Sequence, residues 1–245
     1  MTIAITHPGK MGDTLYALPL ARLVSSLTGE QIDFYTSEYC KPLQNLIEYQ
    51  SYVNECIIPA DYTIERMDIG VQPWLMPVRE GYSKVIHAGF HGVPDRPIHE
   101  FIAHQAGYTQ FLDLRYDYPE LTTSLQYEDY ICIAPRGETS FKHLFDGVAK
   151  LSNVNAVIIG GKGDYTGYGI DYTGLDMLDT LSILSRAKGF VGLMSSQLVL
   201  ANGFPIPRIA PHDGIHWDMR HVVYSHLNHY PINPSVADVL ALLDK

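Results

Sequence analysis

The chain of 245 residues is long enough for one large domain or two of ordinary size, and its hydrophobic fraction of 46% suits a globular protein with a buried core. Its formal net charge is -10 and it contains no block of lysine or arginine, which argues against a dedicated DNA-binding protein and against a polybasic membrane anchor. No stretch approaches the roughly 20 consecutive apolar residues of a membrane-spanning helix, and the amino-terminal sequence lacks the pattern of a secretory signal.

The cysteines are few and widely spaced. Cys40, Cys56 and Cys132 are odd in number, so they predict neither a disulfide framework nor a zinc site. Buried free thiols are typical of a reducing compartment, and the sequence therefore predicts a cytoplasmic protein.

The first twenty residues are the most informative segment. A short β-branched run at 2–6 leads into a glycine-containing turn at 7–12, and an amphipathic run then begins at Asp13. This pattern predicts the first βα unit of an open α/β sheet, in which ligands bind outside the carboxyl ends of the strands. Gly12 and Asp13 lie at that edge, where glycine allows close approach to the backbone. Asp13 is therefore either a functional acid or the N-cap of the helix.

The first half of the chain continues as alternating strands and helices. Gly107 is placed to end one of these helices. The expected strands are 31–36, 56–59 and 84–87, and the expected helices are 13–24, 40–49 and 98–106.

A segment without sustained periodicity, 112–127, predicts a linker, and the pattern of strands and helices then restarts. The expected strands of the second half are 130–134, 156–159, 170–172, 190–193 and 207–210, and the expected helices are 141–151, 175–187, 196–202 and 236–243. Strands that alternate with helices imply parallel sheets. The fold class is thus α/β, with two Rossmann-like, doubly wound domains that face a cleft and span residues 1–125 and 126–245.

Histidines occur at the predicted carboxyl edges. His87 and His91 belong to the loop region after one strand of the first domain, and His212 with Asp213 follows the strand at 207–210. These residues are candidates for an acceptor-side pocket. Five histidines fall between positions 212 and 229, but their spacing fits no recognised zinc pattern, so no metal site is predicted.

Several segments, in order, resemble the family 9 glycosyltransferases, the bacterial heptosyltransferases. The resemblance covers most of the chain. The matching segments are Gly12-Asp13 with Leu18-Pro19, Ile133-Ala134-Pro135 with Lys142-His143-Leu144, Val157 to Gly161 with Asp164, Asp171 to Gly174 with the helix that follows, and Gly192 with Ser195 and Leu200-Ala201.

The resemblance implies a GT-B fold and an inverting, metal-independent transfer of a sugar from a nucleotide-sugar to an acceptor hydroxyl. It implies that Asp13 is the general base that takes the proton of the acceptor hydroxyl. It implies that Lys142 contacts the donor diphosphate and that Asp164 is a candidate for the donor ribose hydroxyls. Ser195 and Ser196 open a helix, where backbone N–H groups favour phosphate oxygens.

The resemblance also implies the partners. They are a nucleotide-sugar donor bound mainly by the second domain and a small-molecule or glycan acceptor, with no further cofactor. The composition argues against a nucleic-acid partner, and it predicts no integral membrane contact. The sequence leaves the oligomeric state open.

Each donor-side residue has a purely structural interpretation as well. Lys142 is otherwise a solvated lysine at a helix start, and Gly160-Gly161 is otherwise a tight turn. Arg136 either binds a phosphate bidentately or bridges to Glu138.

The last motif departs from the family pattern. Met194, Ser196 and Val199 stand where the family has Asp, Gly and His. This departure favours an alternative hypothesis, a non-catalytic nucleotide or nucleotide-sugar binding protein of the same fold. A third hypothesis is a viral-type transferase that glycosylates nucleic-acid bases, against which the acidic charge argues.

Overall fold

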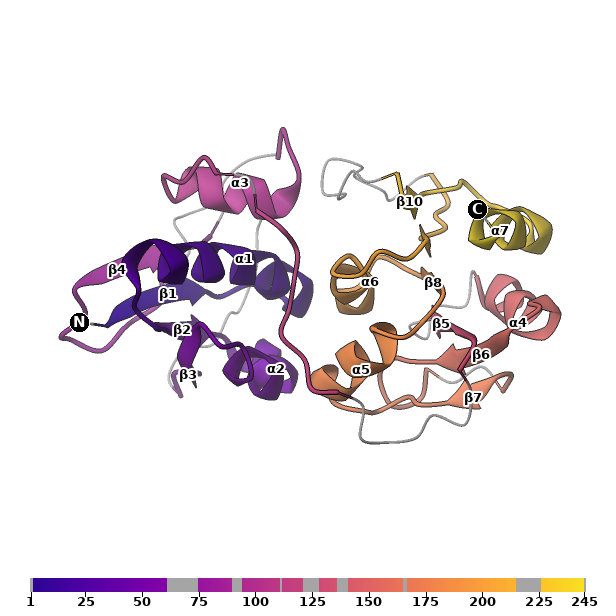
Figure 1. Ribbon diagram of the computed structural model, residues 1–245, viewed down its shortest axis with the longest axis horizontal. Coiled ribbons are helices and arrows are strands. Elements are labelled where there is room, and N and C mark those ends of the chain that lie inside the picture. The colour runs from indigo at the N-terminus through magenta and orange to yellow at the C-terminus, as the bar shows by residue number, and fades with distance from the viewer. Residues whose placement is uncertain are drawn as a thin grey trace. The chain divides into compact units, whose positions relative to one another are not determined.

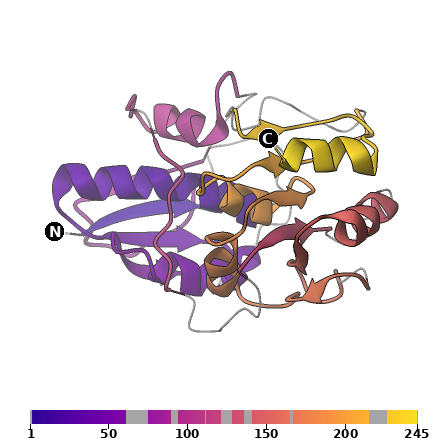
Figure 2. The same ribbon diagram turned by 45° about the vertical axis from the view of Figure 1, so that its right-hand side comes forward.

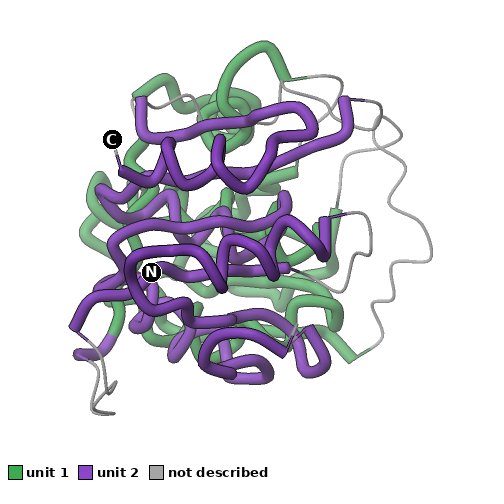
Figure 3. Tube along the Cα trace, turned by 90° about the vertical axis from the view of Figure 1, so that its right-hand side faces the viewer, with its two compact units in different colours: residues 1–118, 219–222 green, residues 119–218, 223–245 purple. Residues whose placement is uncertain are grey.

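The computed structural model describes residues 2–60, 75–89, 94–110, 112–120, 128–135, 141–164, 167–214 and 226–244. The chain forms two compact units, coloured separately in Figure 3. Unit 1 comprises residues 1–118 with 219–222, and unit 2 comprises residues 119–218 with 223–245. The boundary expected between residues 125 and 126 lies outside the described residues.

Unit 1 contains a parallel sheet of four described strands in the order β3-β2-β1-β4. Helix α1 packs on β1, β2 and α3, and α2 packs on β3 (Figure 1). The strands are β1 (Ile3–His7), β2 (Ile32–Thr36), β3 (Val53–Ile57) and β4 (Lys84–His87). The helices are α1 (Met11–Thr28), the 3-10 helix η1 (Glu38–Leu43), α2 (Gln44–Glu48) and α3 (Ile98–Gln105).

Unit 2 contains a parallel sheet of six described strands in the order β10-β9-β8-β5-β6-β7. The strands are β5 (Tyr130–Ala134), β6 (Asn155–Ile158), β7 (Ile170–Asp171), β8 (Phe190–Gly192), β9 (Arg208–Ile209) and β10 (Asn228–His229). The helices are α4 (Lys142–Leu151), α5 (Met177–Leu184), α6 (Ser196–Ala201) and α7 (Val236–Leu243).

Helices cover both faces of the unit 2 sheet. Helices α4 and α7 lie side by side on one face, as Figures 1 and 2 both show, and α5 and α6 pack together on the other. The apolar stripe of α4, with Phe145 and Val148 fully buried, packs on Ile131, Ile133 and Ile158 of the sheet. The alternation of strand and helix thus produces the predicted doubly wound α/β architecture.

Helix α1 contains a proline, and a side chain from elsewhere in unit 1 replaces the backbone hydrogen bond that the helix loses there. Pro19 has no N–H to donate, which frees the carbonyl of Leu15, four residues earlier. The hydroxyl of Tyr116 donates to this carbonyl over 3.3 Å. A residue 101 positions away along the chain therefore satisfies the backbone group that Pro19 leaves open.

The segment that follows Tyr116 is fixed to unit 1 by side chains. The carboxylate of Asp117 accepts hydrogen bonds from the backbone N–H of Ser51 at 2.8 Å and from its hydroxyl at 2.7 Å. Arg22 lies 3.2 Å from the same carboxylate. The expected linker at 112–127 is therefore, up to Asp117, an ordered part of unit 1.

The structure corrects some expected elements and confirms others. Helix α1 begins at Met11, and its N-cap is Lys10, so Asp13 is the third helical residue and does not cap the helix. The helix expected at 40–49 is a 3-10 turn followed by the short α2. Strand β10 was not predicted, since two residues carry no period. The helix expected at 236–243 is α7, and Ser235 caps it with a full capping box.

The three cysteines are free and buried, as expected. Among the described residues, no helix is both long enough and apolar enough to cross a bilayer.

Two buried histidines make unit 1 sensitive to acid. Burial lowers the pKa of His7 and of His99 to about 4, whereas an unfolded histidine titrates near 6.5. Between about pH 6.5 and 4 the unfolded chain binds more protons, so stability falls as the pH falls through this window. We expect a loss of up to about 3 kcal/mol per ring, measured by chemical denaturation at several pH values with hydrogen exchange to resolve the units.

The matched variant is His99→Gln, which cannot titrate. In the wild-type protein the ring of His99 stacks on the ring of Tyr16, with the two ring centroids 6.2 Å apart. The variant should reduce the pH dependence of unit 1 and leave that of unit 2 unchanged. An unchanged pH dependence in unit 1 would contradict the assignment.

Candidate functional site

The described strands of each unit have one topological switch point, beside the first strand of the unit. In unit 1 the chain passes from β1 to β2 and β3 on one side and to β4 on the other. In unit 2 it passes from β5 to β6 and β7 on one side and to β8 on the other. Ligands of open α/β sheets bind outside the carboxyl ends of the strands at such points. The β1/β4 edge and the β5/β8 edge are therefore the two candidate binding sites, and each is described by itself.

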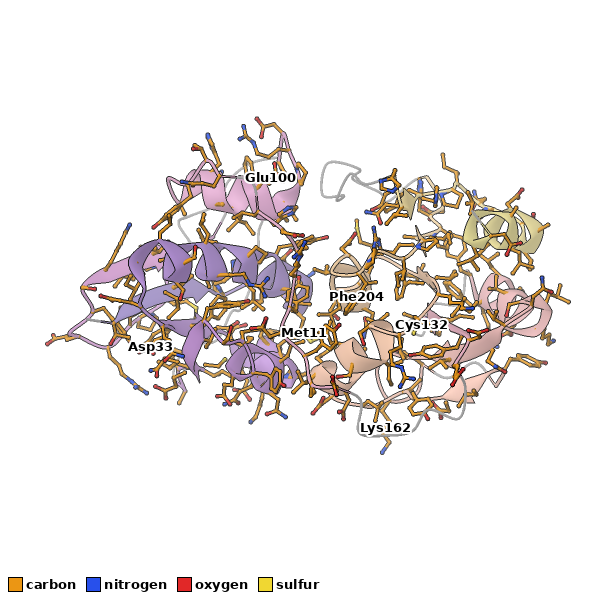
Figure 4. All side chains as sticks on the ribbon, in the orientation of Figure 1. Met11, Asp33, Glu100, Cys132, Lys162 and Phe204 are labelled. Carbon is orange, nitrogen blue, oxygen red and sulfur yellow. The ribbon has the colours of Figure 1, made fainter. Side chains whose placement is uncertain are left out.

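Asp13 lies at the β1/β4 edge. It is in the first turn of α1, whose first residue Met11 is labelled in Figure 4, and it is partly buried. The positive end of the helix dipole favours a carboxylate in this turn. Gly12, the neighbouring predicted residue, occupies the second helical position.

Gly9 is in close contact with two side chains of this edge. A β-carbon at Gly9 would lie 2.3 Å from Nε2 of His7 and 2.9 Å from Cβ of Asp13. The absence of a side chain at Gly9 therefore lets the imidazole of His7 and the side chain of Asp13 occupy the same small region.

A buried hydrogen-bond network holds the backbone of Gly9. Its carbonyl accepts from Sγ of Cys40 at 3.2 Å and from the hydroxyl of Ser37 at 3.4 Å. Thr14, next to Asp13, places its hydroxyl 3.1 Å from the same Sγ. Burial raises the pKa of the Cys40 thiol, which therefore stays protonated and can donate. The loop before α1 is thus fixed by Ser37, the N-cap of η1, and by groups of η1 and α1.

His7 was not singled out from the sequence, and the structure places it at the centre of this edge. Its ring is buried, and Nδ1 lies 2.7 Å from the carbonyl oxygen of Ala88, which follows β4. A carbonyl only accepts, so Nδ1 carries the proton and Nε2 of the neutral ring is an acceptor. The ring ties the end of β1 to the end of β4, an interaction that only the parallel β1–β4 pairing makes available.

His87 belongs to the same edge. It ends β4, is exposed, and places Nδ1 2.8 Å from the hydroxyl of Thr6. Partial burial lowers the pKa of its ring. His91, the other predicted residue of this region, lies outside the described residues.

Ser195 and Ser196 lie directly after β8, at the unit 2 switch point. Ser195 is the N-cap of α6, but its side chain makes no capping hydrogen bond. Its Oγ is buried and has no hydrogen-bond partner within the described part of the chain. A buried polar group without a partner is costly, and a ligand oxygen or N–H group would satisfy it.

The glycine loop after β6 is stabilised by the carboxylate of Asp164, which belongs to the same loop. Gly160 has φ +144°, and the carboxylate of Asp164 accepts from the N–H of Gly161 at 2.7 Å. The carbonyl of Gly160 accepts from the N–H of Gly174. Lys162, labelled in Figure 4, lies in this loop and is exposed. The two glycines thus form a tight turn, and Asp164 stabilises it.

Lys142 begins α4, which follows β5. Its Nζ lies 2.7 Å from the carboxylate of Asp146, one turn further along the helix, and half of its side chain is exposed. Arg136, in the loop between β5 and α4, lies outside the described residues.

His212 and Asp213 follow β9, one strand further from the switch point. Nε2 of His212 donates to the carbonyl of Tyr230 at 3.2 Å, and Nδ1 accepts from the N–H of Gly214 at 3.1 Å. The ring therefore stabilises its own loop, while Asp213 is exposed.

The structure thus brings the predicted residues together in two groups. Gly12, Asp13 and His87 share the β1/β4 edge of unit 1. In unit 2 the carboxyl ends of the adjacent strands β8, β5 and β6 lead to Ser195 and Ser196, to Lys142, and to the Gly160–Asp164 loop. Within the described ranges, no group of three or more His, Cys, Asp or Glu residues has an arrangement that would hold a metal ion.

Comparisons with known proteins find structural relatives but no sequence relatives. No protein-family model and no curated protein sequence matches the chain. Escherichia coli heptosyltransferase WaaC with ADP superposes over 100% of this chain and 99% of its own, with a TM-score of 0.68 and 13% identity. A family 9 glycosyl transferase from Veillonella parvula DSM 2008 covers 86% of this chain and 80% of its own, with a TM-score of 0.58 and 16% identity.

The chain has the GT-B fold. A further match is the iron-containing dodecameric glycosyltransferase TibC from enterotoxigenic E. coli H10407, at a TM-score of 0.64 and 17% identity. It covers 93% of this chain, and this chain spans 61% of TibC. The predicted two-domain Rossmann-like fold and its likeness to heptosyltransferases are therefore confirmed.

The two glycines after β6 of this GT-B chain differ in how they accept a side chain. A β-carbon at Gly160 would lie 2.6 Å from the Asp164 carboxylate at a left-handed φ, whereas one at Gly161 would make contact only at 3.4 Å. We expect Gly160→Ala to destabilise unit 2 by about 2 kcal/mol and Gly161→Ala by less than about 0.5 kcal/mol, measured by urea denaturation. Equal losses in the two variants would contradict this account of the loop.

Proposed function

We propose that this protein is a metal-independent, inverting glycosyltransferase that moves a sugar from a nucleotide-sugar to an acceptor hydroxyl. Asp13 is the general base, and it acts from unit 1. Unit 2 binds the donor. The observation that carries the proposal is the partly buried carboxylate of Asp13 at the switch point of unit 1, in the first turn of a long helix.

Inverting sugar transfer requires a proton acceptor at the β1/β4 edge of unit 1. Inverting transfer needs a group that accepts the hydroxyl proton as the bond to the sugar forms, and a carboxylate can do so. The buried network around Gly9 fixes the loop before Asp13, which supports a base with a defined position. A pure binding protein has no need of an acid at this edge.

Two side chains of unit 2 support the proposed donor site. Ser195 offers a buried hydroxyl that has no hydrogen-bond partner among the described residues, and Lys142 offers a cation at the neighbouring strand end. A cation and hydrogen-bond donors stabilise the charge that grows on a departing diphosphate. Among the structural relatives, WaaC was solved with ADP and with ADP-2-deoxy-2-fluoro heptose, which supports an ADP-sugar as the first donor to test.

A second candidate function is nucleotide or nucleotide-sugar binding without transfer. The observation that favours it is the departure before and within α6, where Met194 and Val199 stand in place of the acid and the histidine of the resembling family. Val199 is buried inside the unit, so its side chain packs in the core rather than facing a ligand.

The substitution Asp13→Asn separates the two functions. It keeps the shape of the side chain and removes its basicity, so transfer should fall by about 100-fold to 10,000-fold while donor affinity stays nearly unchanged. Nucleotide release from ADP-, UDP- and GDP-sugars measures transfer, and calorimetry measures affinity. The control is Glu55→Gln, a surface acid paired with Arg79. An equal loss of affinity and transfer in Asp13→Asn would contradict the role of a base.

Lys142 provides an independent test of the donor site. A ligand that binds only the folded protein raises its melting temperature, so we expect nucleoside diphosphates to stabilise the protein and Lys142→Met to reduce that shift. The matched control is Lys188→Met, because Lys188 is a similarly exposed lysine, paired with Asp129 at the opposite edge of the sheet. Equal shifts in both variants would exclude Lys142 from the donor site. No shift with any nucleotide in the wild-type protein would favour a degenerate donor pocket.

A further inference from the structure

His7 is the buried titratable group at the β1/β4 edge that the proposed function leaves without a role. Its ring lies between the ends of two strands, with Nδ1–H donating to the carbonyl of Ala88 at 2.7 Å. Because this bond fixes both the ring orientation and the tautomer, the acceptor nitrogen Nε2 has a fixed place.

That place is beside Asp13. Nε2 of His7 and Cβ of Asp13 both lie within 3 Å of the single point where Gly9 would carry a β-carbon. The carbonyl of Gly9 is held by Ser37 and Cys40. The three residues are therefore packed against one another by a glycine whose own position is fixed by side-chain hydrogen bonds.

The titratable groups near the ring come from α1, η1 and β4, and the loop itself carries Lys10, which is exposed. Asp13 faces it from α1, and the thiol of Cys40 approaches the same loop from η1 and is protonated. His87, at the end of β4, bonds Thr6 rather than His7. Burial keeps His7 itself neutral, with a pKa of about 4.

We propose that His7 is a positioning residue for Asp13, whose Nε2 lone pair accepts a hydrogen bond from the Asp13 carboxyl group once that group has taken up a proton. Two acceptors that face each other repel weakly when both are unprotonated and are joined when one is protonated. His7 therefore raises the affinity of Asp13 for a proton and strengthens it as a base. This inference rests on the proposed function of Asp13.

The proton balance of the step is simple. The O–H bond of the acceptor hydroxyl breaks as its oxygen attacks the sugar, and the proton moves to the Asp13 carboxylate. The new O–H of Asp13 donates to Nε2 of His7, which keeps its own proton on Nδ1. The bond between the sugar and the donor phosphate oxygen breaks as the new bond forms, and the departing nucleoside diphosphate takes the electron pair and the negative charge.

Two substitutions at His7 separate the hydrogen bond that Nδ1 donates to Ala88 from the acceptor role of Nε2. In His7→Asn the side-chain amide can still donate to Ala88 but is too short to provide an acceptor at the place of Nε2. In His7→Gln the longer side chain can provide that acceptor. NMR of the Asp13 carboxyl carbon reports its titration directly in the full-length protein. We expect His7→Asn to move the midpoint to lower pH by about one unit, the size of one hydrogen bond, and His7→Gln to move it less.

An unchanged Asp13 midpoint in a folded His7→Asn protein would overturn the proposal. If the His7 variants do not fold, the same coupling is measured from the other partner. In Asp13→Asn the nearby anion is lost, so the His7 ring should protonate at lower pH than in the wild-type protein, as followed by its ring nitrogen shifts. An unaltered His7 titration in that variant would overturn the proposal as well.

The pH dependence of sugar transfer from a nucleotide-sugar tests whether the coupling between His7 and Asp13 affects catalysis. In His7→Asn the acid limb of the kcat/KM profile should shift to lower pH in parallel with the Asp13 midpoint, with kcat reduced about tenfold and KM for the donor unchanged. A purely structural role would lower the melting temperature without moving that limb. If the wild-type protein transfers no sugar while the NMR coupling is present, the proposed function fails and the coupling between His7 and Asp13 stands.

Discussion

The carboxyl edge of the unit 1 sheet depends on how the backbone of Gly9 is held. Its carbonyl accepts from Ser37 and Cys40, and its missing side chain leaves room for His7 and Asp13. Every group that bears on the proposed chemistry of this unit lies within this arrangement. A loop that carries the proposed general base, Asp13, has to keep one conformation, and here a buried polar network provides it.

The two units use the same plan with different chemistry at the edge. In both, the first strand lies beside a switch point and a glycine-containing loop follows a parallel strand. Unit 1 places an acid and a neutral imidazole at its edge, which suits the removal of a proton. Unit 2 places hydroxyls, a glycine loop and a lysine at its edge, which suits the binding of phosphate and sugar oxygens. The fold supplies the location, and the side chains supply the function.

Long-range contacts complete groups that the local sequence leaves open. Tyr116 donates to the carbonyl that Pro19 frees in α1, and Asp117 ties the next segment to the loop at Ser51. Neither contact has a local signal, because the partners are separated by 101 and 66 residues along the chain. They explain why a proline is tolerated in a buried helix and why the segment at 112–117 is ordered without regular secondary structure.

Local patterns were sufficient for most of the architecture. The sequence pattern predicts the strands at 84–87 and 130–134 and the helix at 236–243 with the bounds that the structure has, since each is set by residues close along the chain. The alternation of strands and helices determined the parallel α/β class. The sequence pattern places the start of α1 at Asp13, because Asp is a favoured cap, whereas the helix begins at Met11.

The composition of the site was decided by tertiary structure. The sequence placed Asp13 at a strand end, but it could not show that His7 faces the same point, because that depends on the pairing of β1 with β4 and on the carbonyl of Ala88, 81 residues away. It likewise could not show that Asp164 closes its own glycine loop or that His212 binds its own backbone, since both depend on φ angles and on hydrogen bonds formed after folding. Sequence alone determined which residue types reach the carboxyl edges, and the folded chain decided which of them meet.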